Sequence, residues 1–267
     1  MTGATSGIGL EIARGLAGLG ARVIMVGRDP GKAARAAEQV GGSVEVALAD
    51  LSSLDAVRAL GAELLERCPR IDVLMSNAGV YRMRRRLTVD GFEETFAVNH
   101  LASFLLTHLL LDRLKASAPA RIVMVASGAH HGAVLDLDDL QLSRAYGHWK
   151  AYSRSKLANV MFTYALARRL DGTGVTANSL HPGFVATHLG SGNHIPVRPF
   201  YWVIRPFVRS PRAGARTAVY LASSPECEGE NGGYWFDERR VSSSPFSLDE
   251  ELQERLWAES EALVGLP

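Results

Sequence analysis

The sequence has few of the features that mark secreted, membrane-spanning or nucleic-acid-binding proteins. Only two cysteines, Cys68 and Cys227, occur in 267 residues, which excludes a disulfide framework and fits a reducing compartment. No apolar run reaches the roughly 18 to 20 residues that a membrane span needs. The formal net charge of +1 provides no positive field for nucleic acid. We therefore expect a cytoplasmic protein with no nucleic-acid partner.

What is present is an alternation of short apolar runs, rich in Val and Ile, with longer segments of helical periodicity. Continuous apolar runs are typical of strands that are buried on both faces. Such runs occur at residues 22–26, 43–48, 71–75, 121–125, 175–180 and, as a late candidate, 233–236. Helical periodicity marks residues 11–19, 33–40, 53–68, 92–114 and 152–170. The alternation predicts an α/β fold, a single Rossmann-like, doubly wound parallel sheet flanked by helices.

Two local signals mark where helices begin, and one signal is missing at the start of the chain. Ser53 is an expected N-cap, and Asp90 or Gly91 lies where the helix over 92–114 should begin. Only Met1 and Thr2 precede a glycine-rich turn, too few for a strand of the usual five or six residues. In this fold the first strand lies between the second and the fourth. We therefore expect a truncated first strand and a natural start upstream of Met1, the alternative being a rearranged strand or a partner that fills the gap.

The glycine-rich turn at residues 2–9 reads TGATSGIG and leads directly into a helical segment. Small residues let the backbone approach a pyrophosphate, and a helix N-terminus supplies N–H donors with a partial positive charge. The glycines, Gly3, Gly7 and Gly9, follow the spacing G-x3-G-x-G rather than the commoner G-x-G-x-x-G. The turn predicts a dinucleotide site, although a glycine turn that binds nothing is the alternative when the motif stands alone.

Further motifs follow the predicted strands, at the edge where ligands of open parallel sheets bind. They are Asp50-Leu51 and Asn77-Ala78-Gly79. These positions favour a bound cofactor over an empty turn.

The end of the second predicted strand bears on the choice of cofactor. It reads Gly27-Arg28-Asp29, with no carboxylate at the strand end to bind a ribose 2′-hydroxyl. A guanidinium can instead bind a 2′-phosphate through two hydrogen bonds. Arg28 therefore favours NADP, with NAD as the alternative cofactor and a solvated pair with Asp29 as the alternative role of this side chain.

Tyr152 and Lys156 form a candidate acid–base pair. Residues four apart project from the same face of a helix, and Ser127 follows the strand over 121–125 at the same sheet edge. A free phenol titrates near 10, and a lysine ammonium about 4 Å away would supply roughly the 4 kcal/mol needed to bring that pKa close to neutral. Tyrosine and lysine also occur at this spacing by chance, so the other motifs give the pair its weight.

The motif set TGATSGIG, DL, SNAG and Tyr-x-x-x-Lys resembles the short-chain dehydrogenase/reductase family, and the resemblance covers nearly the whole chain from residue 2. Ser76 stands where the family usually has asparagine, and Ala126 replaces the first residue of a Ser-Ser pair. The resemblance implies one NAD(P)-binding domain over residues 1–267 and an oxidoreductase that needs no metal. The scattered histidines agree, since none shows tight ligand spacing with a third partner.

The resemblance also implies roles for individual residues. Ser127 would orient the substrate oxygen, Tyr152 and Lys156 would handle the proton, and Asn99 would hold a relay water and distort its helix. Asp50 would lie near the adenine, and the segment over 182–187 would contact the nicotinamide. The cofactor contacts implied are Gly3, Thr5, Ser6, Gly7, Ile8, Gly9, Arg28, Asp50, Leu51, Asn77, Ala78, Gly79, Tyr152, Lys156, Pro182, Gly183, Val185 and Thr187.

A finer resemblance is to the retinol dehydrogenase-like branch. It rests on Ala129-His130-His131, on YSRSKLAN at 152–159, on His181-Pro182-Gly183 and on LASSPECEG at 221–229. That branch implies lipophilic alcohols, aldehydes or ketones as substrates. A non-catalytic protein that senses NADP(H) on the same fold is the alternative, and loss of the tyrosine or lysine would favour it; both are present.

Three remaining expectations concern surfaces. The stretch 184–211 breaks the strand–helix rhythm, and we predict that it is a substrate lid. Within it, residues 199–208 are apolar and aromatic, typical of a core helix or of a face that takes substrate or touches lipid. The basic run at 81–86 is typical of a solvated loop, the alternative being attraction of an anionic substrate or peripheral contact with a membrane. A homo-oligomer is also expected.

Overall fold

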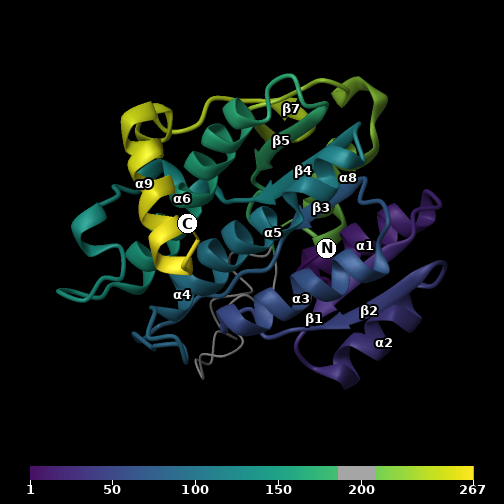
Figure 1. The fold of residues 1–267 in the computed structure, drawn as a ribbon, viewed down its shortest axis with the longest axis horizontal. Helices are drawn as coiled ribbons and strands as arrows, with labels where there is room; N and C mark the ends of the chain where they lie inside the picture. The colour runs from purple at the N-terminus through teal and green to yellow at the C-terminus, as the bar shows by residue number, and fades with distance from the viewer. Residues whose placement is uncertain (186–208, 267) are drawn as a thin grey trace.

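The computed structural model describes residues 1–185 and 209–266, and a mostly parallel sheet lies at its centre (Figure 1). The larger part of the sheet has the order β3-β4-β5-β6-β7, and β1 pairs with β2 beside it. Every pairing is parallel except that between β6 and β7. The strands are β1 (Val23–Gly27), β2 (Val44–Leu48), β3 (Val73–Ser76), β4 (Ala120–Val125), β5 (Val175–Leu180), β6 (Gly233–Phe236) and β7 (Arg239–Arg240).

The six predicted strands are confirmed, and the seventh was not predicted. β7 has two residues and lies antiparallel at the sheet edge, where it pairs Trp235 with Arg240 and Phe236 with Arg239. Two exposed arginines carry no apolar pattern, so no sequence signal marked this strand.

Met1 and Thr2 lie between β1 and β3, the place expected for the first strand. The Thr2 amide donates to the carbonyl of Met75 (2.9 Å), and the Val26 amide donates to the carbonyl of Met1 (2.9 Å). Thr2 also forms a parallel bridge with Val26. These contacts join the two parts of the sheet and bring the glycine turn to the carboxyl ends of β1 and β3.

Helices cover both faces of the sheet. They are α1 (Gly7–Gly18), α2 (Pro30–Val40), α3 (Leu54–Arg67), the short α4 (Glu94–Phe96), α5 (Ala102–Ala116), α6 (His148–Arg169), α8 (Pro211–Ser223) and α9 (Glu250–Val264). Single 3-10 turns lie at Gly128–Gly132, Leu137–Asp139, Pro225–Cys227 and Pro245–Leu248.

The alternation of side chains along β4 shows how the sheet is buried on both sides. Ile122 and Met124 belong to the apolar cluster that includes residues of α3, α5 and α6. Val123 and Val125 belong to a second cluster with residues of α1, α2 and α8. Because both faces of the strand are apolar, its sequence is a continuous hydrophobic run rather than an alternating one.

The helix predicted over 92–114 begins later and is interrupted. It starts at Glu94, because the Glu93 carboxylate caps it by accepting from the amides of Thr95 (2.9 Å) and Phe96 (2.8 Å). Asp90 was wrong as a candidate start; its carboxylate instead accepts from the amide of Leu54 at the start of α3 (2.9 Å). The prediction of Ser53 as an N-cap is confirmed by its bond from the Ala56 amide (3.3 Å).

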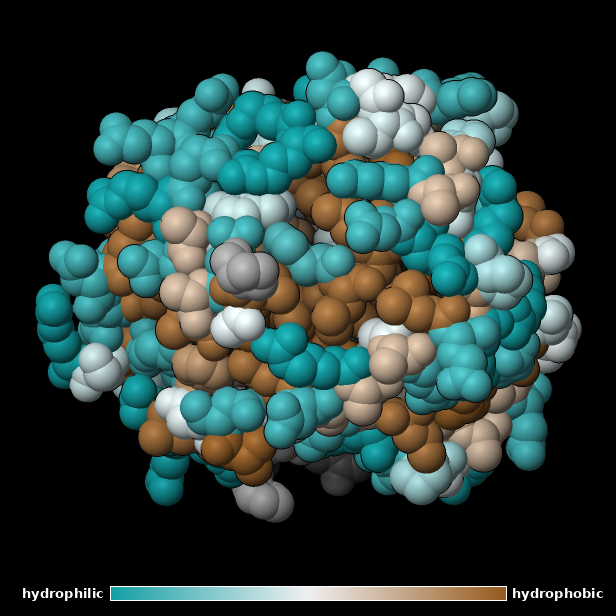
Figure 2. Space-filling model, viewed as in Figure 1, coloured by the Kyte–Doolittle hydropathy of each residue, from teal (hydrophilic) through white to brown (hydrophobic). Residues whose placement is uncertain are grey.

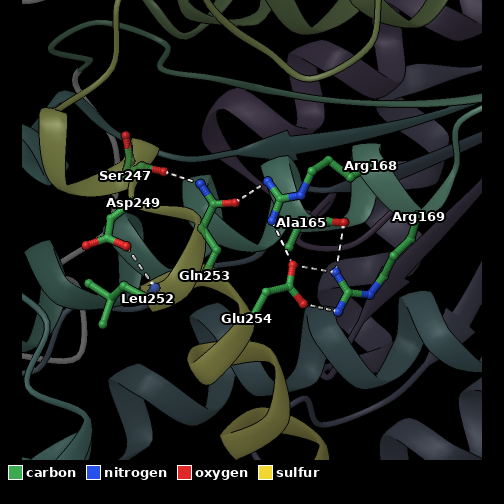
Figure 3. Close-up of polar contacts among 8 residues, drawn as sticks. All are labelled: Ala165, Arg168, Arg169, Ser247, Asp249, Leu252, Gln253 and Glu254. Atoms are coloured by element: carbon green, nitrogen blue, oxygen red, sulfur yellow. Dashed lines mark hydrogen bonds and ion pairs between the residues drawn. The ribbon is translucent and has the colours of Figure 1, made fainter.

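Two described helices, α8 and α9, were outside the predicted set, although each has a capping signal. Ser210 precedes Pro211 at the start of α8, and Asp249 accepts from the amide of Leu252 at the start of α9. Figure 3 shows how α9 is held against α6: Glu254 pairs with both Arg168 and Arg169. The helix that ends the described chain is thereby fixed beside α6.

No helix among residues 1–185 and 209–266 is long and apolar enough to cross a membrane. On the face shown in Figure 2, apolar side chains gather near the middle, over α3 and α5, and hydrophilic side chains surround them. Partly buried residues of these helices, among them Leu65, Leu109 and Leu111, pack against the core.

Candidate active site

A cavity of about 880 Å³ opens at the carboxyl ends of the parallel strands. It brings together almost all of the predicted site residues. Those that line it are Gly3, Thr5, Ser6, Gly7, Ile8, Gly9, Arg28, Asp50, Leu51, Asn77, Ala78, Gly79, Ser127, Tyr152, Lys156, Pro182, Gly183 and Val185. Asn99 is fully buried behind the wall, and Thr187, like residues 199–208 and most of the predicted lid, lies outside the described residues.

The glycine turn is locked against the Asn77 segment. The Asn77 side-chain amide donates to the carbonyls of Thr2 (3.1 Å) and Gly3 (2.9 Å), and the Thr2 hydroxyl accepts from the amides of Asn77 (3.0 Å) and Ala78 (3.1 Å). Gly3 has a φ of +64°, and a Cβ there would lie 2.7 Å from the Ala78 Cα. The backbone therefore packs more closely than any side chain would permit.

Replacement of Gly9 by alanine is expected to destroy this packing. The new Cβ would lie 2.1 Å from the Gly3 carbonyl oxygen, so the turn must move away from its place at the cavity. We expect loss of NAD(P)H binding in a fluorescence titration and a fall in the free energy of unfolding of at least about 2 kcal/mol.

Gly18→Ala is the matched control, since it lies in the same helix and its Cβ would meet nothing within 4 Å. This variant should bind NAD(P)H like the parent and be as stable as the parent or slightly more so. Unchanged NAD(P)H affinity in the Gly9 variant would contradict the packing argument.

The first turn of α1 faces this cavity with its N–H groups. Ser6 is the N-cap residue, and among the described residues its side chain makes no capping hydrogen bond to the helix. Unpaired N–H groups at a helix N-terminus favour an anion. The close backbone and these donors fit a dinucleotide pyrophosphate.

The end of β1 presents two cations to the same cavity. Arg28 and Lys32 both line it and are exposed. Asp29 does not pair with Arg28, because its carboxylate caps α2 by accepting from the Lys32 amide (2.8 Å). In the described part of the chain no ion pair involves Arg28. Lys32 was missed by the sequence analysis, although its place in the first turn after Asp29 was a usable signal.

Tyr152 and Lys156 lie on the wall of the cavity that α6 forms. Tyr152 is 9% exposed and Lys156 3% exposed. The Lys156 ammonium donates to the carbonyl of Val125 (2.9 Å) and lies 5.8 Å from the centre of the Tyr152 ring. The predicted side-by-side placement on one helix face is therefore observed, with β4 supplying the lysine's hydrogen-bond partner.

The pKa of Tyr152 does not move in the direction expected from the neighbouring lysine. Burial raises the pKa of the Tyr152 hydroxyl, and hydrogen bonding with Ser127 opposes this rise only in part. Burial also lowers the pKa of Lys156 to about 8. Desolvation is the largest cause of both shifts, because both side chains are buried and the ammonium's hydrogen-bond partner is the backbone carbonyl of Val125.

Asn99 lies in a π turn, Ala97–Leu101, that interrupts the helix between α4 and α5. Its side-chain amide donates to the Val80 carbonyl (3.1 Å) and to the Ser155 hydroxyl (2.9 Å), and its side-chain oxygen accepts from the Val80 amide (2.7 Å). The carbonyl of Asn99 accepts from the Asn159 side chain (2.9 Å). The helix distortion implied by the resemblance is present, and Asn99 fixes the segment that follows Gly79.

Aromatic side chains that the sequence analysis did not select also line the cavity. Tyr81 and Trp149 lie beside Tyr152, with ring centres 5.6 Å and 6.2 Å from it, and Phe184 is largely exposed at the wall. The signal for Tyr81 was hidden by the basic run that follows it. That run is only partly a solvated loop, because Arg82 is buried and forms an ion pair with Glu94.

Residues 1–194 match the family model described as short chain dehydrogenase. The chain therefore belongs to the short-chain dehydrogenase/reductase family and is an NAD(P)-dependent oxidoreductase. Within that family it is retinol dehydrogenase-like. It is 46% identical to human retinol dehydrogenase 14 and 43% identical to human retinol dehydrogenase 13, and the matches cover all of this chain and 85% and 84% of those proteins.

Solved structures agree in fold. An uncharacterized protein from Mycobacterium paratuberculosis superposes with a TM-score of 0.82 at 37% identity, covering 99% of this chain and 92% of that one. The Pseudomonas aeruginosa RhlG/NADP active-site complex gives a TM-score of 0.73 at 28% identity, covering 92% and 94% of the two chains.

Proposed function

We propose that this protein transfers hydride between NADP(H) and the carbonyl or alcohol carbon of a lipophilic substrate. The observation that carries the cofactor choice is the arrangement after β1. Arg28 and Lys32 reach the cavity, while the Asp29 carboxylate accepts from the Lys32 amide and caps α2. Two cations at the end of β1, with the neighbouring Asp29 carboxylate engaged in capping α2, suit a 2′-phosphate better than a 2′-hydroxyl. The NADP complex of a structural relative supports this choice.

The side chains around Tyr152 support the lipophilic substrate. Val80, Tyr81, Trp149, Phe184 and Val185 line the cavity and present mainly apolar surface. A carbonyl compound with an apolar body would bury that body among them and leave its oxygen to the polar groups behind. The curated relatives are named retinol dehydrogenases, so retinol and retinal belong among the substrates to be tried.

A nicotinamide cofactor held in this cavity would supply the hydride for reduction or accept it in oxidation. The Tyr152 hydroxyl donates a proton to the oxygen of a carbonyl substrate and takes it back in the oxidation direction. Ser127 donates a hydrogen bond that orients the same oxygen. The Lys156 ammonium stabilises the phenolate that forms on Tyr152. Asn99 bonds both the amide and the carbonyl of Val80 and thereby fixes this part of the cavity wall.

The test is NADPH consumption over a panel of apolar aldehydes and ketones, retinal included, beside polar carbonyl compounds of similar reactivity. We expect higher kcat/KM for the apolar members. Equal values for a polar sugar aldehyde and for retinal would contradict the substrate class.

Substitution of Arg28 by aspartate is expected to raise the KM for NADPH by at least tenfold and to improve the use of NADH. The loss of one charge-assisted bidentate contact corresponds to about 1.5 to 3 kcal/mol, and the new carboxylate can accept from a ribose hydroxyl. Arg35→Asp, an exposed change on α2 outside the cavity wall, is the control and should leave the KM for NADPH within about twofold. A parent protein that already prefers NADH would overturn the assignment of Arg28.

Four further predictions from the sequence belong to the same proposal. The two described ends of the predicted lid are joined, since Val185 forms a bridge with Arg209 and the Arg209 amide donates to the Phe184 carbonyl (2.8 Å). The two described ends of the predicted lid therefore lie side by side, and Val185 lines the cavity. The substrate lid over 184–211, the single domain, the cytoplasmic location and a homo-oligomer stay predictions.

A further inference from the structure

His181 lies where the central sheet meets the cavity. It follows Leu180, the last residue of β5, and its amide donates to the carbonyl of Trp235 on β6 (3.0 Å). This bond extends the pairing of the two strands by one residue. His181 is partly buried and lines the cavity. The sheet therefore fixes the backbone of a residue that belongs to the wall of the site.

The imidazole of His181 is held by ring stacking. It lies parallel to the Phe236 ring, with an angle of 7° between the planes and 4.1 Å between the centres. The Arg209 guanidinium lies over the same phenyl ring, 4.8 Å from its centre. Two hydrogen bonds to the Asp237 carboxylate, both of 2.5 Å, hold that guanidinium in place. These contacts fix the plane in which the imidazole nitrogens lie.

The Nδ1 of His181 accepts a hydrogen bond from the amide of Gly183 (3.2 Å). Burial lowers the pKa of His181 to about 4, so the ring is neutral at physiological pH and Nδ1 can act as an acceptor. A side-chain acceptor that binds the amide two residues further on is the contact of an Asx turn, which asparagine or aspartate usually makes. Here a histidine makes the same contact across Pro182.

The turn at Gly183 depends on the absence of a side chain. Its φ is +82°, and a Cβ there would lie 2.7 Å from the Arg209 Cδ and 3.4 Å from the Phe236 Cε2. The carbonyl of the next residue, Phe184, accepts from the Arg209 amide (2.8 Å). The turn therefore packs against the same two side chains that hold the His181 ring, and residues 182–185 all line the cavity.

This turn borders the end of the cavity where Ser127 lies. Gly128, the residue after Ser127, approaches His181 so closely that a Cβ there would lie 3.8 Å from Nδ1. The Ser127 side chain hydrogen-bonds with Tyr152. The imidazole thus lies between the loop that carries Ser127 and the turn that follows β5.

We propose that His181 is a positioning residue for hydride transfer and acts through the amide of Gly183. The inference rests on the proposed function. Hydride reaches the carbonyl carbon only if the nicotinamide lies beside the oxygen that Tyr152 and Ser127 bind, at the end of the cavity that residues 182–185 border. The His181 Nδ1 keeps this turn in the conformation that forms the wall there, and ring stacking keeps Nδ1 directed at the amide. No covalent bond of His181 changes during the reaction.

Two substitutions separate the hydrogen bond from the ring stacking. In His181→Asn the side-chain oxygen takes the place of Nδ1 as acceptor, and the stacking on Phe236 is lost. In His181→Phe a ring still stacks, but no side-chain atom accepts from Gly183. The measurement is a single turnover with NADPH and the apolar carbonyl compound that the parent protein reduces fastest.

We expect His181→Phe to transfer hydride roughly tenfold more slowly than the parent, or slower still, and His181→Asn to stay within about threefold of it. Thermal unfolding should rank the variants in the opposite order, with a lower Tm for His181→Asn than for His181→Phe, because only the phenylalanine keeps the stacked ring. A role in stability alone would make rate and Tm fall together.

A fragment of the cofactor shows whether the rest of the site is intact. 2′-phospho-ADP-ribose lacks only the nicotinamide of NADP, so both variants should bind it within about twofold of the parent. His131→Phe is the matched control: it makes the same chemical change at another histidine whose ring contacts Tyr234. His131 is exposed and, within the described part of the chain, is not among the residues that line the cavity, so this variant should transfer hydride as fast as the parent.

A His181→Phe variant within about threefold of the parent, or a His181→Asn variant as slow as His181→Phe, would overturn the role of His181 alone. Loss of affinity for 2′-phospho-ADP-ribose in His181→Phe would also overturn it, because the damage would then extend beyond the turn. A parent protein that binds NADPH but transfers hydride to no carbonyl compound of the panel would overturn the proposed function itself.

Discussion

Tyr152→Phe is expected to lower kcat by about 10²- to 10⁴-fold while the NADPH dissociation constant stays within about twofold. The change removes the transferable proton and keeps the ring that packs against Tyr81 and Trp149. Because the substitution removes only the hydroxyl oxygen and keeps the buried ring in place, we expect the fold to stay intact. Steady-state kinetics with an apolar aldehyde, beside a fluorescence titration with NADPH, provide the two measurements.

Tyr164→Phe is the matched control, because it makes the same chemical change in the same helix. Its hydroxyl bonds the Ser243 hydroxyl (2.7 Å), away from the cavity that holds Tyr152. This variant should keep the kcat of the parent. If Tyr152→Phe retains activity within about threefold of the parent, the proton must come from another group.

Lys156→Met is expected to cost activity and to increase stability. The ammonium is the cation beside Tyr152, so its loss should lower kcat by about 10²-fold or more. In the fold, however, burial lowers the pKa of Lys156 from 10.5 to about 8, which means that the folded protein binds this proton less tightly than the unfolded chain. At pH 7 the buried charge costs about 3 kcal/mol.

Methionine at this position removes that cost, but it also loses the hydrogen bond to Val125, which contributes about 1 to 2 kcal/mol. The difference leaves the variant more stable than the parent by roughly 1 to 2 kcal/mol. The pH dependence gives the sharper check. Between pH 8 and 10.5 the unfolded chain keeps the Lys156 proton and the folded protein loses it, so the free energy of unfolding of the parent should rise relative to that of the variant. Chemical unfolding of both proteins across this range measures the difference. A variant that is less stable at pH 7 and shows the same pH dependence as the parent would contradict the burial argument.

The sequence analysis succeeded where the signal is local. Each parallel strand is a continuous apolar run because both faces are covered, as the two environments of Ile122 and Val123 show. Motifs that follow strands were placed in one cavity because parallel strands end at the same sheet edge.

Features that depend on packing were not predictable in this way. Asp90 resembles an N-cap in sequence, and only the fold shows that it binds the start of α3 while Glu93 caps α4. The direction of the Tyr152 pKa depends on how deeply α6 is buried, which no spacing reveals. Lys32 and Tyr81 reach the cavity from neighbouring motifs, so their role is visible only once the chain is folded.

The central claim is hydride transfer from NADPH to a lipophilic carbonyl compound with Tyr152 as the proton donor. The most direct measurement is a single turnover with NADPH in which both hydrogens at C4 are replaced by deuterium, followed by mass spectrometry of the product. The account predicts one deuterium on the former carbonyl carbon in the parent protein and almost none in Tyr152→Phe over the same time. Tight NADPH binding with no deuterium in any product from the apolar panel would contradict the account and favour a protein that senses NADP(H) without turnover.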